Sequence, residues 1–512
     1  MISLSAFPFL SLAIWFPIIS GIFLFVLDNL NSHHIHKVLK KSAVLFAFLS
    51  FICTLIPVIV FDKYDESFQL VEQLSWLKTL NAQYFLGVDG ISIFFLPLTG
   101  LITLLVVCAG LEVVKSNVGL YMGSFLVLSG LMVGVFSALD GLLFYVFFEA
   151  TLLPMYLIIG VWGGPRKVYA GFKFFLYTLL GSLLALLAII YLYSVSGSFS
   201  LPDWYALPLD LTIQIVIFIA FFFAFAVKIP MWPVHTWLPD AHVEAPTGGS
   251  IVLAAVMLKL GGYGFLRLSL PIVPDASNYF SFAIILLSLT AISYIALVAL
   301  IQNDMKKLIA YSSVAHMGFV TLGIFLFSSL GFHGSIFQMI SHGFISGALF
   351  FCIGVLYDRL HSREITDYGG LATTMPIFSA FFVFFAMANC GLPATSGFVG
   401  EFFVILSAIE KNFFIGFFAA LTLILGAAYS LLLVKKLIFG PVLSDSVAQL
   451  QDVNKREFIL LFIFAILVLV LGIKPDLLTS YMNLSIENLL IHVNEGKLIS
   501  FGSPLSLPIR VT

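Results

Sequence analysis

Charge is scarce in this chain of 512 residues: only 10% of them are Asp, Glu, Lys or Arg, while 61% are hydrophobic. A soluble domain is about 25% charged. The composition therefore excludes an ordinary water-soluble fold and indicates a protein that is solvated mainly by lipid. Cysteine is scarce too, and Cys53, Cys108, Cys352 and Cys390 stand at unrelated spacings inside apolar segments. These four predict neither a disulfide framework nor a metal site.

Several patterns that bind cofactors or carry catalysis are missing as well. The sequence has no glycine-rich loop between a strand and a helix, no CxxC pair and no nucleophile elbow. We therefore expect no nicotinamide, flavin, iron–sulfur, haem or other metal site in this chain. The first apolar segment lacks a basic leading region, so no cleavable signal peptide is predicted.

Long apolar runs fill the chain instead. A membrane-crossing helix needs about 20 apolar residues. By that rule we read fourteen spans, at residues 8–28, 42–62, 87–110, 118–138, 141–162, 170–194, 211–240, 247–268, 278–301, 307–328, 332–357, 375–409, 412–437 and 456–474. The seventh and the twelfth are too long for one straight helix, and both contain proline: Pro230 and Pro233 follow Lys228, and Pro393 precedes Glu401. Proline breaks the helical hydrogen-bond ladder, so we predict that both spans are interrupted.

The basic residues and the two interruptions set the expected topology. About twice as many Lys and Arg residues lie in connections on one side of the membrane as on the side of the termini, which places both termini outside. The interruptions are five spans apart, and an odd offset gives them opposite orientations, as in inverted-repeat transporters. We expect an all-α polytopic membrane protein with inverted five-helix repeats. The expected units are residues 1–110 (spans 1–3), 111–270 (first repeat, spans 4–8), 271–440 (second repeat, spans 9–13) and 441–512 (last span and tail).

Four ionisable residues lie inside the apolar runs: Glu149, Lys228, Lys259 and Glu401. A charge at the centre of a bilayer costs about 2.5–3.5 kcal/mol or more, so such residues are rare and usually mark function. Acids and bases that alternate, each able to hold or release a proton, predict a proton path through the membrane. The competing interpretation is structural, with Lys228 reaching the membrane interface from a helix end and Glu149 as its partner.

Histidines extend this set. His316 and His342 lie in consecutive spans close to hydroxyl side chains, and His235 lies beside the interruption of the seventh span. Histidine titrates near neutral pH and relays protons, although a single membrane histidine also serves as a hydrogen-bonded core residue. The candidate proton-translocating residues are Glu149, Lys228, Lys259, His316, His342 and Glu401, with His235 as an addition.

The segment that begins at Lys228 makes the chain recognisable. Its residues 228–242, Lys-Ile-Pro-Met-Trp-Pro-Val-His-Thr-Trp-Leu-Pro-Asp-Ala-His, followed by Glu-Ala-Pro-Thr at 244–247, resemble the core signature of the antiporter-like subunits of respiratory complex I, the proton-pumping NADH-quinone oxidoreductase. Residues 87–92, 311–316, 341–343 and 391–401 are similar to the same family. The resemblance implies fourteen spans in inverted repeats, with Glu149 and Lys228 as an ion pair, Lys259 as the central relay and an exit group at Glu401. Sibling subunits generally carry lysine at that last position.

The resemblance also implies how the chain works with others. It implies a subunit that moves protons while NADH oxidation and quinone reduction proceed elsewhere, beside other membrane-arm subunits that include neighbouring antiporter-like ones. Its partners are then these subunits and membrane lipid, with no nucleic acid. The NADH, FMN, iron–sulfur clusters and quinone of the complex belong to other chains. Two alternatives stay open: a subunit of a multi-subunit cation/proton antiporter, and a structural scaffold that moves no protons.

Overall fold

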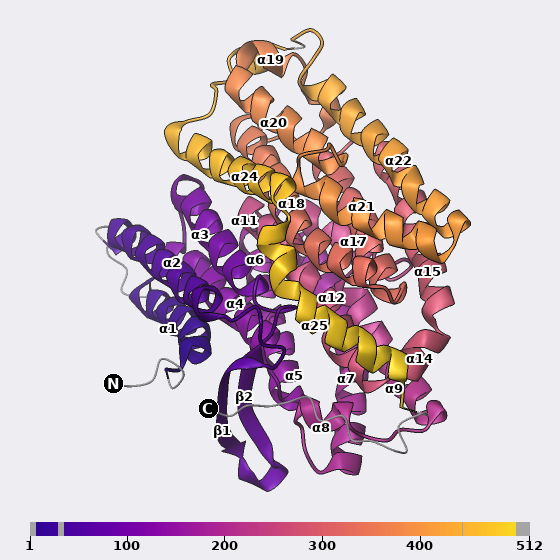
Figure 1. Cartoon of the computed structure of the whole chain (residues 1–512). Coiled ribbons are helices and arrows are strands. Elements are labelled where there is room, and N and C mark those ends of the chain that lie inside the picture. The colour runs from indigo at the N-terminus through magenta and orange to yellow at the C-terminus, as the bar shows by residue number, and fades with distance from the viewer. Residues whose placement is uncertain (1–6, 29–34, 443, 498–512) are drawn as a thin grey trace.

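The structure is a bundle of helices with one small two-stranded sheet (Figure 1). This computed structural model describes residues 7–28, 35–442 and 444–497. The first part of the chain forms α1 (Phe9–Asp28), α2 (Ile35–Val60), β1 (Gln69–Leu77), β2 (Ala82–Val88), α3 (Phe95–Val113), α4 (Val118–Ser137), α5 (Gly141–Ala150), α6 (Leu152–Trp162), α7 (Lys167–Ser196), α8 (Leu201–Tyr205), α9 (Leu211–Lys228) and α10 (Trp237–Glu244).

In the rest of the described chain the named elements are helices. They are α11 (Thr247–Val252), α12 (Leu258–Gly264), α13 (Leu270–Ile272), α14 (Pro274–Tyr279), α15 (Ser281–Thr290), α16 (Ala296–Leu300), α17 (Met305–Phe325), α18 (Ser329–Leu360), α19 (Leu371–Thr374), α20 (Pro376–Asn389), α21 (Ser396–Lys411), α22 (Phe413–Leu437), α23 (Asp445–Ala448), α24 (Lys455–Ile473) and α25 (Asp476–Glu495).

The predicted membrane fold is confirmed. Among the described residues, 13 helices or continuous helix series are long and apolar enough to cross a membrane. The consecutive helices α20 and α21 supply the remaining span, which is interrupted as predicted. Two series, Thr247–Ile272 and Ser329–Leu360, are fully buried in their most apolar stretch. They form the centre of the bundle, so their polar residues face protein and not lipid.

Both predicted interruptions are present. Helix α9 ends at Lys228, and helical structure resumes only at Trp237, because Pro230 and Pro233 cannot continue the ladder. Helix α20 ends at Asn389 and α21 begins at Ser396. Gly391, between them, has a φ of 78°, a left-handed conformation that glycine adopts without steric cost.

The backbone departs from regular helix at two further places that the sequence analysis treated as single helices. The fifth span is divided at Thr151 into α5 and α6, directly after Glu149. Pro154 contributes to this, since it lacks the N–H that would bond to the carbonyl of Ala150. In the eighth span, π-helical stretches at Leu253–Met257 and Phe265–Ser269 stand on either side of α12, which carries Lys259. Such wide turns occur often at functional sites.

Several elements differ from the prediction. Strands β1 and β2 form an antiparallel hairpin, where a loop and, from residue 87, the start of the third span were expected, and α3 begins only at Phe95. Helix α25 occupies what was expected to be a short tail, and α2 begins at Ile35 instead of residue 42. The hairpin is fastened to the start of α1, because the carboxylate of Glu72 accepts hydrogen bonds from the backbone N–H groups of Leu10 (2.7 Å) and Ser11.

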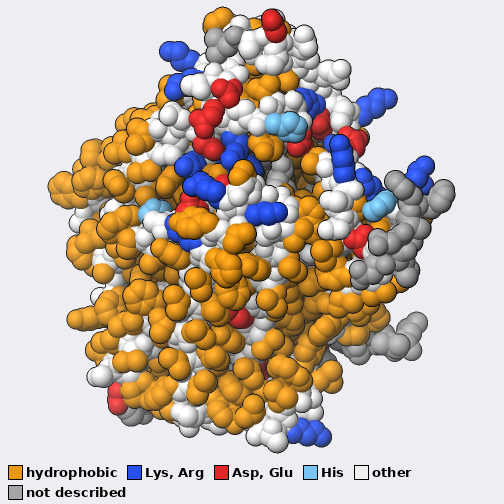
Figure 2. All heavy atoms as spheres, turned by 180° about the vertical axis from the view of Figure 1, so that it is seen from behind, with side chains coloured by type: hydrophobic (Ala, Val, Ile, Leu, Met, Phe, Trp, Pro, Cys, Tyr) orange, Lys and Arg blue, Asp and Glu red, His pale blue; other side chains and the backbone are white. Residues whose placement is uncertain are grey.

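The surface is divided between charge and hydrocarbon. Figure 2 shows charged side chains gathered toward the end of the molecule that holds α19 in Figure 1, above a broad hydrophobic band. Exposed large hydrophobic side chains are numerous on α1, α2, α7 and α22. This is the surface expected of a protein that spans a membrane, with most of its charge at one face.

Candidate functional site

Lys228 is the last residue of α9 and lies inside the protein, with only 2% of its surface exposed. Its Nζ donates to the hydroxyl of Thr151 at 3.3 Å and lies 4.6 Å from the centre of the Phe148 ring. The end of α9, where the seventh span is interrupted, therefore contacts the break between α5 and α6 in the fifth span. The charge of Glu149 acts on Lys228 electrostatically, but its carboxylate is not a hydrogen-bond partner of Nζ. The two residues are neighbours without a direct ion pair.

Glu149 lies at the edge of this meeting point and is only half-buried. The hydroxyl of Ser182, on α7, interacts with its carboxylate, whereas Oε2 is buried with no hydrogen-bond partner among the described residues. One turn earlier on α5, Val146 is 41% exposed. Glu149 thus stands between the interior of the bundle and its outer surface, with one oxygen available to take or release a proton.

Lys259 is completely buried near the middle of the eighth span. Its Nζ contacts the backbone carbonyl of Ala254 and lies 2.8 Å from Nδ1 of His342, on α18. A lysine at this depth has no route to the membrane surface, so its partner has to come from the protein. This partner is His342, whose imidazole can itself bind and release a proton. The hydrogen bond between Lys259 and His342 joins the two central spans.

His316, on α17, makes the next pair. Its Nδ1 lies 2.6 Å from Oε1 of Glu401, and its Nε2 lies 3.1 Å from the hydroxyl of Tyr429. Gln338 donates to the same oxygen of Glu401 at 3.0 Å. These contacts define a consistent arrangement in which the imidazole donates to the carboxylate through Nδ1 and accepts from the tyrosine at Nε2. Glu401 is 3% exposed, and two side chains donate to its Oε1.

A small cavity joins the two pairs. The rings of His316 and His342 have their centres 5.7 Å apart. Together with Gln338, Asn389 and Glu401 they line a space of about 10 Å³. This is close to the smallest volume that holds one water molecule with polar partners. A line of polar groups therefore runs from Lys259 through His342 and His316 to Glu401, with room for a bridging water.

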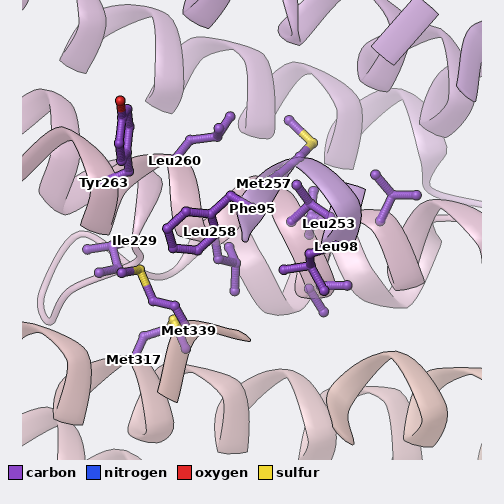
Figure 3. Packing of buried hydrophobic residues seen from close by; sticks show 14 of the residues in the cluster. Phe95, Leu98, Ile229, Leu253, Met257, Leu258, Leu260, Tyr263, Met317 and Met339 are labelled. Carbon is purple, nitrogen blue, oxygen red and sulfur yellow. The ribbon is translucent and has the colours of Figure 1, made fainter. Parts of the chain in front are cut away.

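Apolar side chains enclose this line. Leu258 and Leu260, the sequence neighbours of Lys259, are fully buried, and Figure 3 shows them in the same hydrophobic cluster as Phe95, Ile229 and Met339. Ile229 follows Lys228 directly, so the broken segment of the seventh span packs against the span that carries the buried lysine. This packing excludes water around the polar groups, which strengthens each electrostatic interaction between them.

His235 and His242 differ in what they reach. His235 lies in the interruption of the seventh span, and its ring centre is 6.4 Å from that of Tyr311. Its Nδ1 is buried and has no hydrogen-bond partner within the described ranges. The structure does not bring it into the line above. His242 is fully buried, and neither ring nitrogen has a hydrogen-bond partner among the described residues. Its ring interacts electrostatically with Lys259, which places it beside the line.

Sequence reasoning missed three residues of this region: His242, Gln338 and Tyr429. His242 was part of the recognised signature, as the last residue of Pro-Asp-Ala-His, but carried no assigned role. Gln338 precedes His342 by one helical turn, a spacing that places both on one face of α18. Nothing in the sequence around Tyr429 marks it, since its role depends on the packing of α22 against α17, which carries His316.

Comparison with known proteins places the chain. A family model described as "NADH:quinone oxidoreductase/Mrp antiporter, TM" matches residues 138–426, more than half of the chain, and this range contains every candidate residue that the sequence analysis named. The chain belongs to this family. NADH-quinone oxidoreductase subunit M of Rickettsia prowazekii (strain Madrid E) is 46% identical over 486 residues, which cover 94% of this chain and 99% of that protein.

A further relative and a solved structure match nearly the whole chain. NADH-ubiquinone oxidoreductase chain 4 of Marchantia polymorpha is 44% identical over 484 residues, covering 94% of this chain and 97% of that protein. A chain in the structure of respiratory complex I from Thermus thermophilus with bound NADH superposes with a TM-score of 0.86 at 30% identity, covering 95% of this chain and 99% of the other. The chain is of the subunit M type, in keeping with the glutamate at position 401.

Proposed function

We propose that this chain carries protons across the membrane as one pumping subunit of an NADH:quinone oxidoreductase. The oxidation of NADH and the reduction of quinone take place in other subunits, which also hold the cofactors. The observation that carries the proposal is the enclosed line that joins Lys259, His342, His316 and Glu401. Acids and bases that exchange protons are expensive to bury, and here they contact one another in the middle of a membrane bundle.

The proposed route begins at the meeting of the interrupted spans. A change in the electrostatic interaction between Glu149 and Lys228 alters the proton affinity of Lys228, because a nearby carboxylate stabilises the charged amine and burial opposes it. The proton then passes to Lys259, on to His342 and His316, and leaves through Glu401. His235 stands near the start of this route. Each step requires that the donor and the acceptor of the proton lie within hydrogen-bond distance of each other or of a bridging water.

The route needs an external source of free energy. Moving one proton against a membrane potential of 100 mV costs about 2.3 kcal/mol. The redox reaction of the complex has to supply this, since the chain itself holds no reaction that releases energy. This requirement explains why such a subunit works only beside the others of the membrane arm and in contact with membrane lipid.

We also propose a bacterial inner-membrane location with both termini on the periplasmic side. The start of α1 and helix α25 support this, since both lie at the hairpin end of the molecule, opposite the face rich in basic residues. The division into residues 1–110, 111–270, 271–440 and 441–512 remains our proposal for the functional units. In this division Glu149, Lys228 and Lys259 belong to the first repeat, and His316, His342 and Glu401 to the second.

Replacement of Glu401 by glutamine tests the route. Glutamine keeps the shape and the hydrogen bond to Gln338 but cannot take up a proton, so Glu401→Gln is expected to slow NADH-driven proton pumping by about tenfold or more. Electron transfer from NADH to a soluble artificial acceptor should continue at the parent rate, because the redox sites lie elsewhere. Both rates are measured on the purified complex, with pumping followed in liposomes.

The matched control is Glu410→Gln, on the same helix but exposed to solvent. It should pump at the parent rate. Pumping at the parent rate by Glu401→Gln, Lys259→Ala and Lys228→Ala alike, in fully assembled complex, would show that the chain is a scaffold and not a proton carrier.

A further inference from the structure

A second cavity opens at the charged end of the molecule. Its volume is about 370 Å³, which lies within the range of cavities that hold small ligands. It lies between the ends of α3, α6 and α18 and the starts of α4, α11 and α24, and none of the residues of the proposed proton route lines it. Elements that are far apart in the chain therefore enclose a space that the proposed route does not use.

One basic side chain on the cavity wall has nitrogens without a partner. Nη2 of Arg456 lies 3.1 Å from Oε2 of Glu112, whereas Nε and Nη1 are buried and make no hydrogen bond within the described part of the chain. A buried donor that stays unpaired lowers stability, and the cost is greater for a charged group. The guanidinium of Arg456 therefore indicates an acceptor that a ligand in the cavity supplies.

The cavity also holds an acid that is not paired. Of the two carboxylates that line it, Glu457 is held by Arg359 through hydrogen bonds of 2.7 and 3.2 Å. Asp358 is exposed and forms no salt bridge with any residue that the structure describes. Lys115, also exposed, adds a second positive charge to the lining. Both signs of charge are thus on offer, so a ligand that carries both fits better than a simple anion, which the acids would repel.

Aromatic rings form another part of the wall. Trp162, the last residue of α6, meets Tyr121 edge to face with ring centres 5.1 Å apart, and Phe351 is buried beside the cavity. Nε1 of Trp162 donates to the carbonyl of Ser116 at 3.3 Å. Tryptophan at the end of a membrane helix is typical of the depth at which lipid headgroups lie. Aromatic faces also attract ammonium groups.

An apolar stripe on α6 leads from Trp162 toward the middle of the membrane. Leu153, Leu157 and Val161 follow one another at intervals of four residues, and they are 61%, 41% and 37% exposed. The stripe is about 12 Å long at 1.5 Å per residue. A polar cavity at headgroup depth is thus continuous with an exposed hydrocarbon surface, which is the arrangement that an amphipathic ligand requires.

We propose that this cavity binds the headgroup of phosphatidylethanolamine, a zwitterionic phospholipid. The phosphate accepts hydrogen bonds from the guanidinium of Arg456 and faces the charge of Lys115. The primary ammonium donates to the carboxylate of Asp358, next to the rings of Tyr121 and Trp162, and one acyl chain lies along the stripe of α6. The bound lipid joins the end of α18 to the ends of α3 and α6. This inference goes beyond the proposed pumping function and does not depend on it.

Photo-crosslinking of the assembled complex in nanodiscs tests the site. The probe is phosphatidylethanolamine with a diazirine near the start of one acyl chain, and mass spectrometry locates the labelled peptides. We expect label on residues 153–162, reduced about tenfold in Asp358→Asn and in Arg456→Gln by the loss of one charge-assisted hydrogen bond. The matched controls are Glu364→Gln and Lys455→Gln, exposed residues that do not line the cavity, and both should be labelled like the parent.

Other probes separate the possible ligands. Phosphatidylcholine has a trimethylammonium group that cannot donate to Asp358, and phosphatidylglycerol lacks the positive charge altogether. The same diazirine on either lipid is expected to label residues 153–162 at least threefold less. Free phosphoethanolamine at millimolar concentration should leave the labelling by phosphatidylethanolamine unchanged, because the acyl chain holds the lipid at the site.

Three outcomes would overturn the proposal. The first is equal labelling by all three lipids, or parent labelling in both Asp358→Asn and Arg456→Gln, which indicates unspecific contact with the bilayer. The second is loss of labelling when phosphoethanolamine is added, since the cavity would then take a soluble ester. The third is loss of labelling in Asp358→Glu, which keeps the carboxylate and is expected to be labelled near the parent level; its loss would mark the position as structural.

Discussion

At the scale of single residues, the buried polar groups of this protein are of two kinds. Lys259, His316 and Glu401 have close partners that also bind protons. His242 is completely buried, and neither of its ring nitrogens has a partner in the part of the chain that the structure describes. A buried unpaired polar group costs free energy, and a residue that lowers stability in the centre of the bundle needs a functional explanation. Relay of protons beside Lys259 provides one.

His242→Phe separates stability from function. Phenylalanine keeps the stacking on Phe350 and removes two unpaired nitrogens, so the free energy of unfolding is expected to stay within about 1 kcal/mol of the parent or to rise. Proton pumping is expected to fall severalfold, because the new ring cannot carry a proton. Thermal unfolding of the complex and pumping in liposomes measure the two effects. A variant that is stable and pumps at the parent rate would exclude His242 from the route.

At the scale of elements, a buried ion pair fixes the turn that precedes α3 to the eighth span. Nη2 of Arg267 donates to Oδ1 of Asp89 at 2.6 Å, with both side chains less than a tenth exposed. The same carboxylate oxygen accepts from the backbone of Ile91 and Ser92. The pair thus holds the end of the span that carries Lys259 against the loop after the hairpin, and so sets the position of that span.

Arg267→Met is expected to destabilise this arrangement. Removing one partner leaves Asp89 buried with an uncompensated charge, at a cost of about 3–5 kcal/mol. The control is Arg166→Met, since Arg166 is 61% exposed in its pair with Glu244 and an exposed pair contributes less than about 1 kcal/mol. Thermal unfolding of the two purified variants gives the comparison. Equal losses would show that the buried pair has no special weight.

At the scale of the whole molecule, helix α25 links elements that are far apart in the chain. Figure 1 shows it crossing the bundle toward α14. Ser485 accepts from the N–H of Gly90 at 2.9 Å, and Asn483 lies 2.8 Å from Nε2 of His333 on α18. A side chain at Gly90 would meet the carbonyl of Tyr481 at 2.1 Å, so the close contact depends on glycine there. The helix therefore connects the turn that precedes α3 to α18 on the hairpin side of the molecule.

The docking of this segment is expected to depend on pH. Burial lowers the pKa of Lys497, just after α25, to about 7, an effect that Asp275 opposes. Between about pH 7 and the ordinary lysine pKa of 10.5 the released segment binds more protons than the docked one, so docking strengthens as pH rises through this window. Burial also lowers the pKa of His492, which acts in the same direction at lower pH.

Hydrogen exchange measures this dependence. After correction for intrinsic exchange rates, the amides of α25 are expected to be better protected at about pH 10 than at about pH 7. Lys497→Met should make the protection nearly independent of pH over this range. Protection in the unchanged chain that does not vary with pH would refute the prediction.

Much of the fold could be read from the sequence, because its determinants are local. The length of an apolar run predicts a span, and a proline next to Lys228 or before Glu401 predicts where the helix is interrupted. The hairpin and α25 were missed, since neither has an apolar run long enough to stand out from a loop. The division of the fifth span at Thr151 was missed as well, because this span has the length of one straight helix, although Pro154 in its interior signals a break.

The sequence by itself determined that this is a membrane protein, how many times it crosses, and which acids, lysines and histidines lie within the hydrocarbon. Only the tertiary structure decided which of them meet. Lys259 and His342 are 83 residues apart in the chain, and His316 and Glu401 are 85 apart. It also decided that Lys228 binds Thr151 and not Glu149. Burial follows from each segment's own composition, whereas contact between buried groups follows from how the spans pack, and proton transfer depends on contact.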